Sequence, residues 1–161
     1  MTKAVFITGV NGGIGKACAH HFKSEGFIVL GTDLVEAPNN SVDKFYAGNI
    51  TDEQMWLKVS QDLQSSNTAL DALVNIAGRN YYAEITEASL DEWRDMFNVN
   101  IVGMVAAIKH LTNFLRKSSK PAIVNMSSIS GYIGSHGYAA YCATKGAVDS
   151  LTKSQIGRAD V

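Results

Sequence analysis

The first 33 residues follow an order that few folds share: an apolar strand, a glycine-rich turn, a helix, a second apolar strand and an acid. The apolar runs are residues 4–7 and 27–30, and a helix is expected over residues 14–25 between them. The turn carries three glycines, Gly9, Gly13 and Gly15, spaced differently from the common G-x-G-x-x-G pattern. Glycines let the backbone approach a pyrophosphate closely, and amides at a helix start bind its charge. This order predicts a dinucleotide-binding unit.

Asp33 follows the second apolar run and bears on the choice of cofactor. Its carboxylate can accept hydrogen bonds from the hydroxyls of an adenosine ribose, and it would repel a 2′-phosphate. Residues 34–36 contain no Arg or Lys to reverse that repulsion. The sequence therefore favours NAD over NADP, although an acid at a strand end can also be an ordinary surface residue.

Further apolar runs continue the alternation of strands and helices. Strands are expected over residues 44–47, 71–78 and 122–126, and the last is expected to be buried. Residues 36–43 are polar and contain Pro38, so the crossover helix before the third strand is expected to be short or absent. No internal repeat or second-domain linker is found.

Two helix starts are expected from capping boxes, in which a Ser or Thr precedes a Gln or Glu by three residues. These pairs are Thr51 with Gln54 and Ser89 with Glu92. The second helix is expected to reach about Arg116, with Asn98 and Asn100 in its interior. Asn is a poor helix former, so a buried amide there suggests a specific hydrogen-bonding task. The alternative, a solvent-facing Asn, suits Asn98 better than Asn100.

Tyr141 and Lys145 lie four residues apart on an expected helix, so both project from one face. A phenol with an ammonium one turn away is a candidate acid–base pair. One cation about 4 Å from a phenolate stabilises it by roughly 4 kcal/mol at an intermediate dielectric. Taken alone, the same spacing more often marks a packed aromatic beside a solvated Lys. The dinucleotide-binding unit at the start of the chain reverses that preference.

Composition narrows the class of protein further. At 161 residues with 46% hydrophobic and 18% charged residues, the chain fits one ordinary globular domain. A net charge of -1 gives no reason to expect nucleic acid or an acidic membrane as a partner, and no apolar stretch is long enough to span a bilayer. Cys18 and Cys142 form neither a disulfide framework nor a metal-binding spacing. No metal is expected, and a reducing cytoplasm is the default location.

Together these motifs resemble the short-chain dehydrogenase/reductase family, in the subtype with a Thr-Gly-x-x-x-Gly-x-Gly opening and a Tyr-x-x-x-Lys pair. The resemblance runs from Thr8 to about Ser154. Residues 75–78, Asn-Ile-Ala-Gly, match the family's Asn-Asn-Ala-Gly except at the second position. Ser128 precedes Tyr141 by the family's usual separation of catalytic Ser and Tyr. The resemblance implies an α/β fold, a Rossmann-type doubly wound parallel sheet in three α/β/α layers, formed as a single NAD-binding domain.

The resemblance also implies an NAD-dependent oxidoreductase that interconverts a secondary alcohol and a ketone. Tyr141 would be the general acid/base, Ser128 would hold the substrate oxygen, and Lys145 would bind the nicotinamide ribose and favour the phenolate. Asn100 would order a water that links Lys145 to solvent. Ser127 is the alternative to Ser128 for holding the substrate oxygen, but its spacing from Tyr141 fits the family less well. The implied cofactor-binding residues are Gly9, Asn11, Gly13, Ile14, Gly15, Asp33, Leu34, Asn49, Ile50, Asn75, Ala77, Gly78, Tyr141 and Lys145. Of these, Asn49 stands where the family often has Asp.

The resemblance places residues 80–82, Ser130 and residues 136–138 around the remainder of a substrate pocket. His136 is expected to be a wall residue rather than a second acid–base group. The resemblance also implies a homo-oligomer, a dimer or tetramer, since the long helix from Ser89 and the helix after Tyr141 are the family's usual interface surfaces. The helix from Ser89 also offers more apolar surface than one sheet face can cover. Its apolar residues are Met96, Val99, Val102, Met104, Val105 and Ile108. The alternative is a helix fully buried within a monomer.

The family continues beyond its Tyr–Lys helix into a substrate loop and further strands that this sequence lacks. We expect an internal stretch to be missing after about Ser154, since residues 155–161 look like a segment that the family places after its substrate loop. The sequence therefore names no substrate. It also leaves a second function open: a truncated, non-catalytic NAD-binding module or redox-sensing interaction domain.

Overall fold

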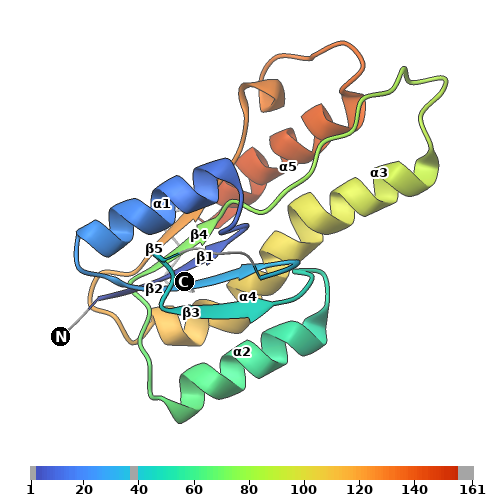
Figure 1. Ribbon diagram of the computed structural model, residues 1–161. Coiled ribbons are helices and arrows are strands. Elements are labelled where there is room, and N and C mark those ends of the chain that lie inside the picture. Colours follow the sequence, from blue (N-terminus) through green and yellow to red (C-terminus); the bar gives the residue numbers. More distant parts are fainter. Residues whose placement is uncertain (1–2, 37–39, 156–161) are drawn as a thin grey trace.

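The computed structural model describes residues 3–36 and 40–155 and contains a five-stranded parallel sheet (Figure 1). The strands are β1 Ala4–Thr8, β2 Ile28–Asp33, β3 Lys44–Ala47, β4 Ala72–Asn75 and β5 Ala122–Asn125. Their order in the sheet is β3-β2-β1-β4-β5. Strands β2 and β3 therefore lie on one side of β1, and strands β4 and β5 lie on the other. This is the doubly wound Rossmann arrangement that the sequence predicts.

Helices connect most of these strands. They are α1 Gly13–Ser24, α2 Glu53–Ser65, α3 Leu90–Phe97, α4 Met104–Leu115 and α5 Ala139–Gln155. A π-helical segment, Asn98–Gly103, joins α3 to α4 without a break, and a short 3₁₀ helix, Ile129–Gly131, precedes α5. No helix occurs in the described part of the connection between β2 and β3, as expected. None of the described helices is both long and apolar enough to cross a bilayer.

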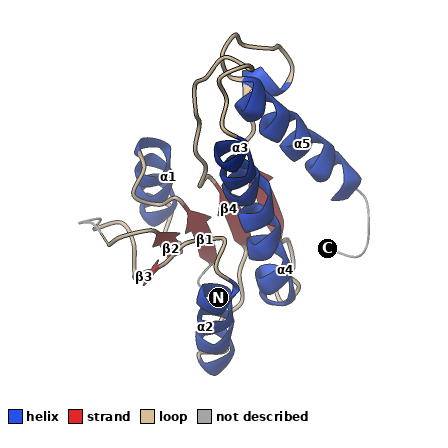
Figure 2. Ribbon diagram, turned by 90° about the vertical axis from the view of Figure 1, so that its right-hand side faces the viewer, coloured by secondary structure: helices blue, strands red, loops and turns tan. Residues whose placement is uncertain are grey.

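The core has two halves because alternate side chains of each strand face opposite sides of the sheet. Val5 and Ile7 of β1 pack with Ala19 of α1 on one face. Ala4 and Phe6 point to the other face, where α2, α4 and α5 supply the partners. The apolar run of β1 is buried throughout because both faces are covered. Figure 2 shows α1 on the opposite side of the sheet from α4, which gives the three α/β/α layers.

Two expectations about the elements are wrong in detail. The β5 strand is not fully buried: Ala122 and Val124 are exposed, because β5 lies at the sheet edge and one of its faces is uncovered by the described elements. The helix α2 is capped by Asp52, whose carboxylate accepts the Gln54 amide, and not by Thr51. The Thr51 amide instead donates to the Asn49 side chain, which closes a turn before the helix.

The long helix expected from Ser89 is present as α3, the π-helical segment and α4, but its start and interior differ from expectation. Ser89 caps α3, whereas Glu92 does not complete a capping box because its carboxylate binds Arg79. The interior carries the π-helical segment, in which Asn98 is exposed and Asn100 is buried. The contrast between these two amides agrees with the sequence interpretation. Of residues 155–161, only Gln155 lies within the described residues.

All five strands point the same way, so their carboxyl ends share one edge of the sheet. The loops after β1, β2, β3 and β4 therefore gather there. Helices α3 and α5 contact each other and extend past this edge (Figures 1 and 2). Ligands of doubly wound sheets bind in the crevice outside the carboxyl ends of the strands, next to the point where the strand order reverses.

Candidate active site

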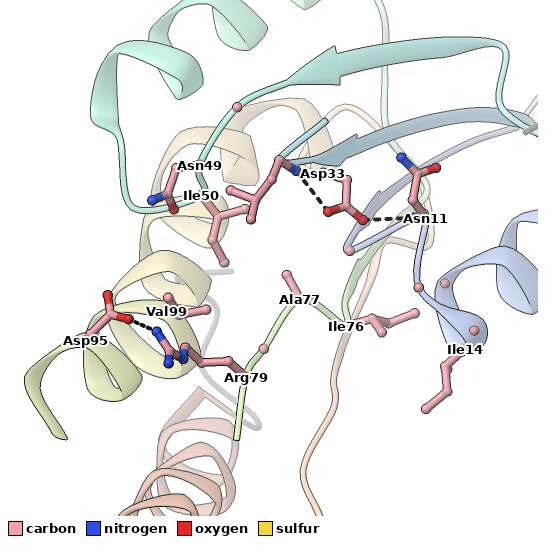
Figure 3. Close-up of a pocket in the computed structure, with 17 residues that line it drawn as sticks. Asn11, Ile14, Asp33, Asn49, Ile50, Ile76, Ala77, Arg79, Asp95 and Val99 are labelled. Atoms are coloured by element: carbon pink, nitrogen blue, oxygen red, sulfur yellow. Dashed lines mark hydrogen bonds and ion pairs between the residues drawn. The ribbon is translucent and has the colours of Figure 1, made fainter. Parts of the chain in front are cut away.

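A pocket of about 730 Å³ opens at the carboxyl edge of the sheet (Figure 3). It contains eleven of the residues predicted to bind the cofactor, which are Gly9, Asn11, Gly13, Ile14, Gly15, Asp33, Leu34, Asn49, Ile50, Ala77 and Gly78. The remaining lining residues, which the sequence interpretation missed, are Gly12, Gly48, Ile76, Arg79, Asp95 and Val99. Gly12 lies in the predicted glycine turn, and Ile76 lies near the end of the strand predicted over residues 71–78. Gly48 and Arg79 directly follow predicted strands, so strand ends and the glycine turn were usable signals for these four residues. No sequence signal marks Asp95 or Val99.

The glycine turn, residues 9–15, forms one wall and has a shape that side chains would prevent. Gly9 adopts a φ of +68°, which favours glycine, and a Cβ there would lie 2.8 Å from the backbone of Ala77. A Cβ on Gly15 would lie 2.1 Å from the Gly9 carbonyl oxygen. Helix α1 begins here with no side-chain cap and no acid in its first turn. Its first amides are therefore suited to an anion such as a pyrophosphate.

Asp33 stands at the end of β2 with its carboxylate toward the glycine turn (Figure 3). One oxygen accepts the Asn11 amide at 2.9 Å, and the other accepts the Leu34 amide at 2.8 Å. The Asn11 side chain in turn donates to the Val35 carbonyl at 2.8 Å. A carboxylate oxygen has two lone pairs, so both oxygens can still accept a hydroxyl donor. The acid is thus preset for ribose hydroxyls.

The turn after β4 lies against the glycine turn and forms the adjoining part of the wall (Figure 3). The Thr8 hydroxyl, at the end of β1, accepts the amides of Ile76 and Ala77 at 3.1 and 3.2 Å. Arg79 follows, and its guanidinium binds both Glu92 and Asp95 of α3. Three of the residues implied to bind the cofactor, Asn75, Tyr141 and Lys145, do not line this pocket. The Asn75 side chain lies buried in the sheet and donates to Asn125 at 2.9 Å.

Tyr141 and Lys145 share one face of α5, as predicted. The Lys145 Nζ lies 5.6 Å from the centre of the Tyr141 ring and donates to the Met126 carbonyl at 2.7 Å. Burial lowers the pKa of the Lys145 ammonium, and the nearby Asp149 carboxylate opposes that shift. An ammonium has three protons, so two remain for a ligand. The pair can therefore bind hydroxyls and transfer a proton at the phenol.

The two candidate serines have different tasks in the structure. The Ser127 hydroxyl donates to the backbone carbonyl of Lys145 at 3.2 Å and so helps to hold α5 on β5. The Ser128 hydroxyl accepts the Ser130 amide at 3.2 Å, which leaves its own proton for another acceptor. This arrangement favours Ser128 for a substrate oxygen, in agreement with its spacing from Tyr141.

Asn100 lies in the π-helical segment and binds the backbone of Arg79 twice. Its Oδ1 accepts the Arg79 amide at 2.8 Å, and its Nδ2 donates to the Arg79 carbonyl at 2.9 Å. A Cβ on Gly78 would come within 3.1 Å of Asn100 Oδ1. The amide therefore fixes the loop that leaves the pocket, next to the small residues Ala77 and Gly78.

The loop after β4 and the loop before α5 are distant in the sequence but meet beyond the sheet edge, where a substrate pocket was expected. The Tyr82 and Tyr138 rings lie 5.3 Å apart, and the Ala83 amide donates to the Gly137 carbonyl at 2.9 Å. His136 is 80% exposed and forms an ion pair with Glu84 at 2.7 Å. His136 is thus held at the surface by Glu84.

Comparisons with known proteins agree with this geometry. A family model described as short chain dehydrogenase matches residues 3–156. The meso-2,3-butanediol dehydrogenase of Serratia marcescens is 35% identical over 94% of this chain and 63% of its own length. The solved structure of Thermoplasma acidophilum aldohexose dehydrogenase in ligand-free form has a TM-score of 0.90 at 31% identity, over 95% of this chain and 60% of that one. The structure of ElxO with NADP bound has a TM-score of 0.86 at 32% identity, over 96% and 66%.

Proposed function

Because the chain belongs to the short-chain dehydrogenase family, we propose that it is an NAD-dependent oxidoreductase that interconverts a secondary alcohol and a ketone. The chain spans about 63% of the length of the butanediol dehydrogenase it matches, so this proposal concerns the activity of the whole protein. The observation that carries it is the Tyr141–Lys145 pair on α5, which extends past the same sheet edge as the glycine turn and Asp33.

The pocket fits a dinucleotide. The first amides of α1 would hold the pyrophosphate, Asp33 would accept the adenosine ribose hydroxyls, and Asn49 with Ile50 would border the adenine. A bound nicotinamide supplies the acceptor or donor of the hydride. NAD is favoured because the fixed Asp33 carboxylate would face a 2′-phosphate, and no base stands beside it in residues 34–36.

Side chains of this protein would transfer the proton to or from the substrate oxygen. In alcohol oxidation Tyr141 removes the hydroxyl proton, and in ketone reduction it returns a proton to the oxygen. Ser128 donates a hydrogen bond to that oxygen and keeps it against the phenol. Lys145 stabilises the phenolate and has two protons left for ribose hydroxyls. Asn100 keeps the loop at Arg79 in place beside the pocket.

We further propose a homo-oligomer. Val102 and Val105 are 52% and 41% exposed on the α3–α4 helix, and Leu90 at its start is 67% exposed. Met96, Val99, Met104 and Ile108 of the same helix are at least half-buried. An exposed apolar strip of this kind supports self-association.

Steady-state turnover with a panel of secondary alcohols and ketones, followed by NADH absorbance, tests the proposal. Tyr141→Phe is expected to lower kcat by about 10²–10⁴-fold, because it removes the proton donor and acceptor but keeps the ring. Undiminished turnover in Tyr141→Phe would refute the mechanism. NADH binding without turnover on any panel member would instead support the non-catalytic module. Parallel assays with NADPH test the choice of cofactor.

A further inference from the structure

Asn100 makes a third hydrogen bond, which leads to α5. Its Nδ2 donates to the Thr144 hydroxyl at 3.0 Å, in addition to its two bonds with the Arg79 backbone. The exposed fraction is 1% for Asn100 and 0% for Thr144. A primary amide has two N–H donors, and both are now used. The Thr144 hydroxyl is thus the acceptor that completes a buried amide whose loss would leave a donor unpaired.

Thr144 lies within the turn of α5 that carries the candidate acid–base pair. Its hydroxyl donates to the backbone carbonyl of Tyr141 at 2.8 Å, and the next residue along the chain is Lys145. The other side of this turn is fixed by β5 and the residues after it: Lys145 binds the Met126 carbonyl, and Ser127 binds the Lys145 carbonyl. The turn is therefore held from two directions, by the end of β5 and by the π-helical segment.

The π-helical segment explains how Asn100 reaches this position. A π-helical turn accommodates an extra residue in a helix and commonly occurs at functional sites. Here it brings the Asn100 side chain inward between the Arg79 backbone and Thr144, where its three hydrogen bonds measure between 2.8 and 3.0 Å. Asn100 thereby joins the loop at the pocket to the turn of α5 that bears Tyr141 and Lys145.

We propose that Thr144 is a positioning residue for the oxidoreductase reaction: its hydroxyl, bound by Asn100, sets the Tyr141–Lys145 turn relative to the cofactor loop at Arg79. This inference rests on the proposed function. It assigns to Thr144 no contact with substrate or cofactor. A misplacement of about 1 Å in such a support can lower a rate about 10²-fold, because proton and hydride transfer require aligned groups.

The same helix contains a close counterpart that serves as a control. The Thr152 hydroxyl accepts the Asn125 amide at 3.0 Å and donates to the Val148 carbonyl at 2.8 Å. Thr144→Val and Thr152→Val each replace a hydroxyl by a methyl group of similar size on α5. Both remove one Asn–Thr hydrogen bond and one bond within the helix. Only Thr144→Val removes the bond to the π-helical segment.

The expected result is that kcat falls while the affinity for the cofactor is nearly unchanged. Thr144→Val should lower kcat about 10- to 100-fold. The Kd for NADH, from fluorescence titration, should change by less than about threefold, because Thr144 itself would contact no cofactor. Thr144→Ser, which retains the hydroxyl, should restore most of the rate. Thr152→Val should lower thermal stability but leave kcat within about twofold. Equal rates in Thr144→Val and wild type, or equal losses in the two valine variants, would overturn the proposal.

A second measurement tests the link without turnover. The Arg79 amide donates to Asn100 Oδ1, so its hydrogen exchange should accelerate about tenfold in Thr144→Val and remain unchanged in Thr152→Val. If Thr144→Val folds too poorly, Thr144→Ala provides the same comparison. Absence of turnover in the wild type would refute the proposed function alone. Unchanged exchange at Arg79 in the Thr144 variant would refute the role of Thr144 alone.

Discussion

Asp33 shows how the backbone can prepare one side chain for a ligand. Each carboxylate oxygen receives one amide, from Asn11 or from Leu34, so the group is oriented before anything binds. Under the proposed function, these oriented acceptors would favour a ribose with free hydroxyls and would repel a 2′-phosphate. We therefore propose that Asp33 determines the discrimination between NAD and NADP, which can be tested on this residue.

Asp33→Asn should weaken that discrimination. The ratio of the Kd for NADPH to the Kd for NADH is expected to fall about tenfold or more, because the repulsion of the phosphate is removed while the shape of the side chain is kept. Fluorescence titrations with both cofactors measure the ratio. Glu36→Gln is the matched control: it removes the same charge three residues away, from an exposed side chain outside the pocket. A ratio unchanged in Asp33→Asn would contradict the assignment.

Lys145 should give the fold a characteristic pH dependence. Because burial lowers the pKa of this ammonium, the unfolded chain binds more protons than the folded one between the folded pKa and about 10.4. The free energy of unfolding contributed by Lys145 therefore rises as the pH rises through this window. Urea unfolding should show wild type gaining stability relative to Lys145→Met from neutral to alkaline pH. The exposed Lys58→Met serves as the control, and a constant difference would contradict the prediction.

Helices α2 and α3 each begin at a residue whose side chain accepts a free amide, and neighbouring contacts determine which residue that is. Asp52 caps α2 by accepting the Gln54 amide, while the Thr51 amide is held by the Asn49 side chain. Ser89 caps α3, whereas Glu92 is drawn away by Arg79. A capping motif thus locates a helix start to within a residue, but neighbouring turns and charges decide which side chain acts.

Asp52→Ala should lower the free energy of unfolding by about 1 kcal/mol, because the Gln54 amide at the start of α2 loses its acceptor. Thr51→Ala is expected to change it by less than about 0.5 kcal/mol. Chemical denaturation of the two variants gives the comparison. A larger loss in Thr51→Ala than in Asp52→Ala would restore the sequence-based assignment of the cap.

For the elements, the sequence predicts most of what the structure shows. Apolar runs and glycine turns locate all five strands in their order, since periodicity and turn residues act over short distances. Two features depend on contacts across the fold and were not predicted. The π-helical segment is stabilised by Asn100 bonding to Arg79 and Thr144. The exposure of β5 follows from its place at the sheet edge, which an apolar run does not reveal.

At the scale of the whole molecule, the candidate site is assembled from loops that only the sheet topology brings together. The family resemblance implied eleven of the pocket residues, which lie near strand ends because parallel strands deliver their loops to one edge. Asp95 and Val99 come from a helix whose placement over the pocket requires the tertiary fold. Asn75 was expected in the pocket by resemblance, yet its side chain bonds Asn125 within the sheet.

Self-association belongs to the same scale. Replacing Val102 and Val105 together by Lys should shift the mass measured by light scattering from an oligomer to a monomer, because two charges would have to be buried in the interface. Leu57→Lys on α2, where the side chain is 40% exposed, is the control and should leave the mass unchanged. A wild-type chain that is monomeric at tens of micromolar would contradict the proposed homo-oligomer.

The contact between the turns after β1 and β4 has a consequence for engineering. Gly9 touches the backbone of Ala77, and the Thr8 hydroxyl receives two amides from the partner turn. A graft that replaces Gly9 or Thr8 in the turn after β1 would therefore clash with Ala77 or lose these bonds unless the segment after β4 were changed with it. Chimeras meant to retune this protein should exchange the two turns as one module.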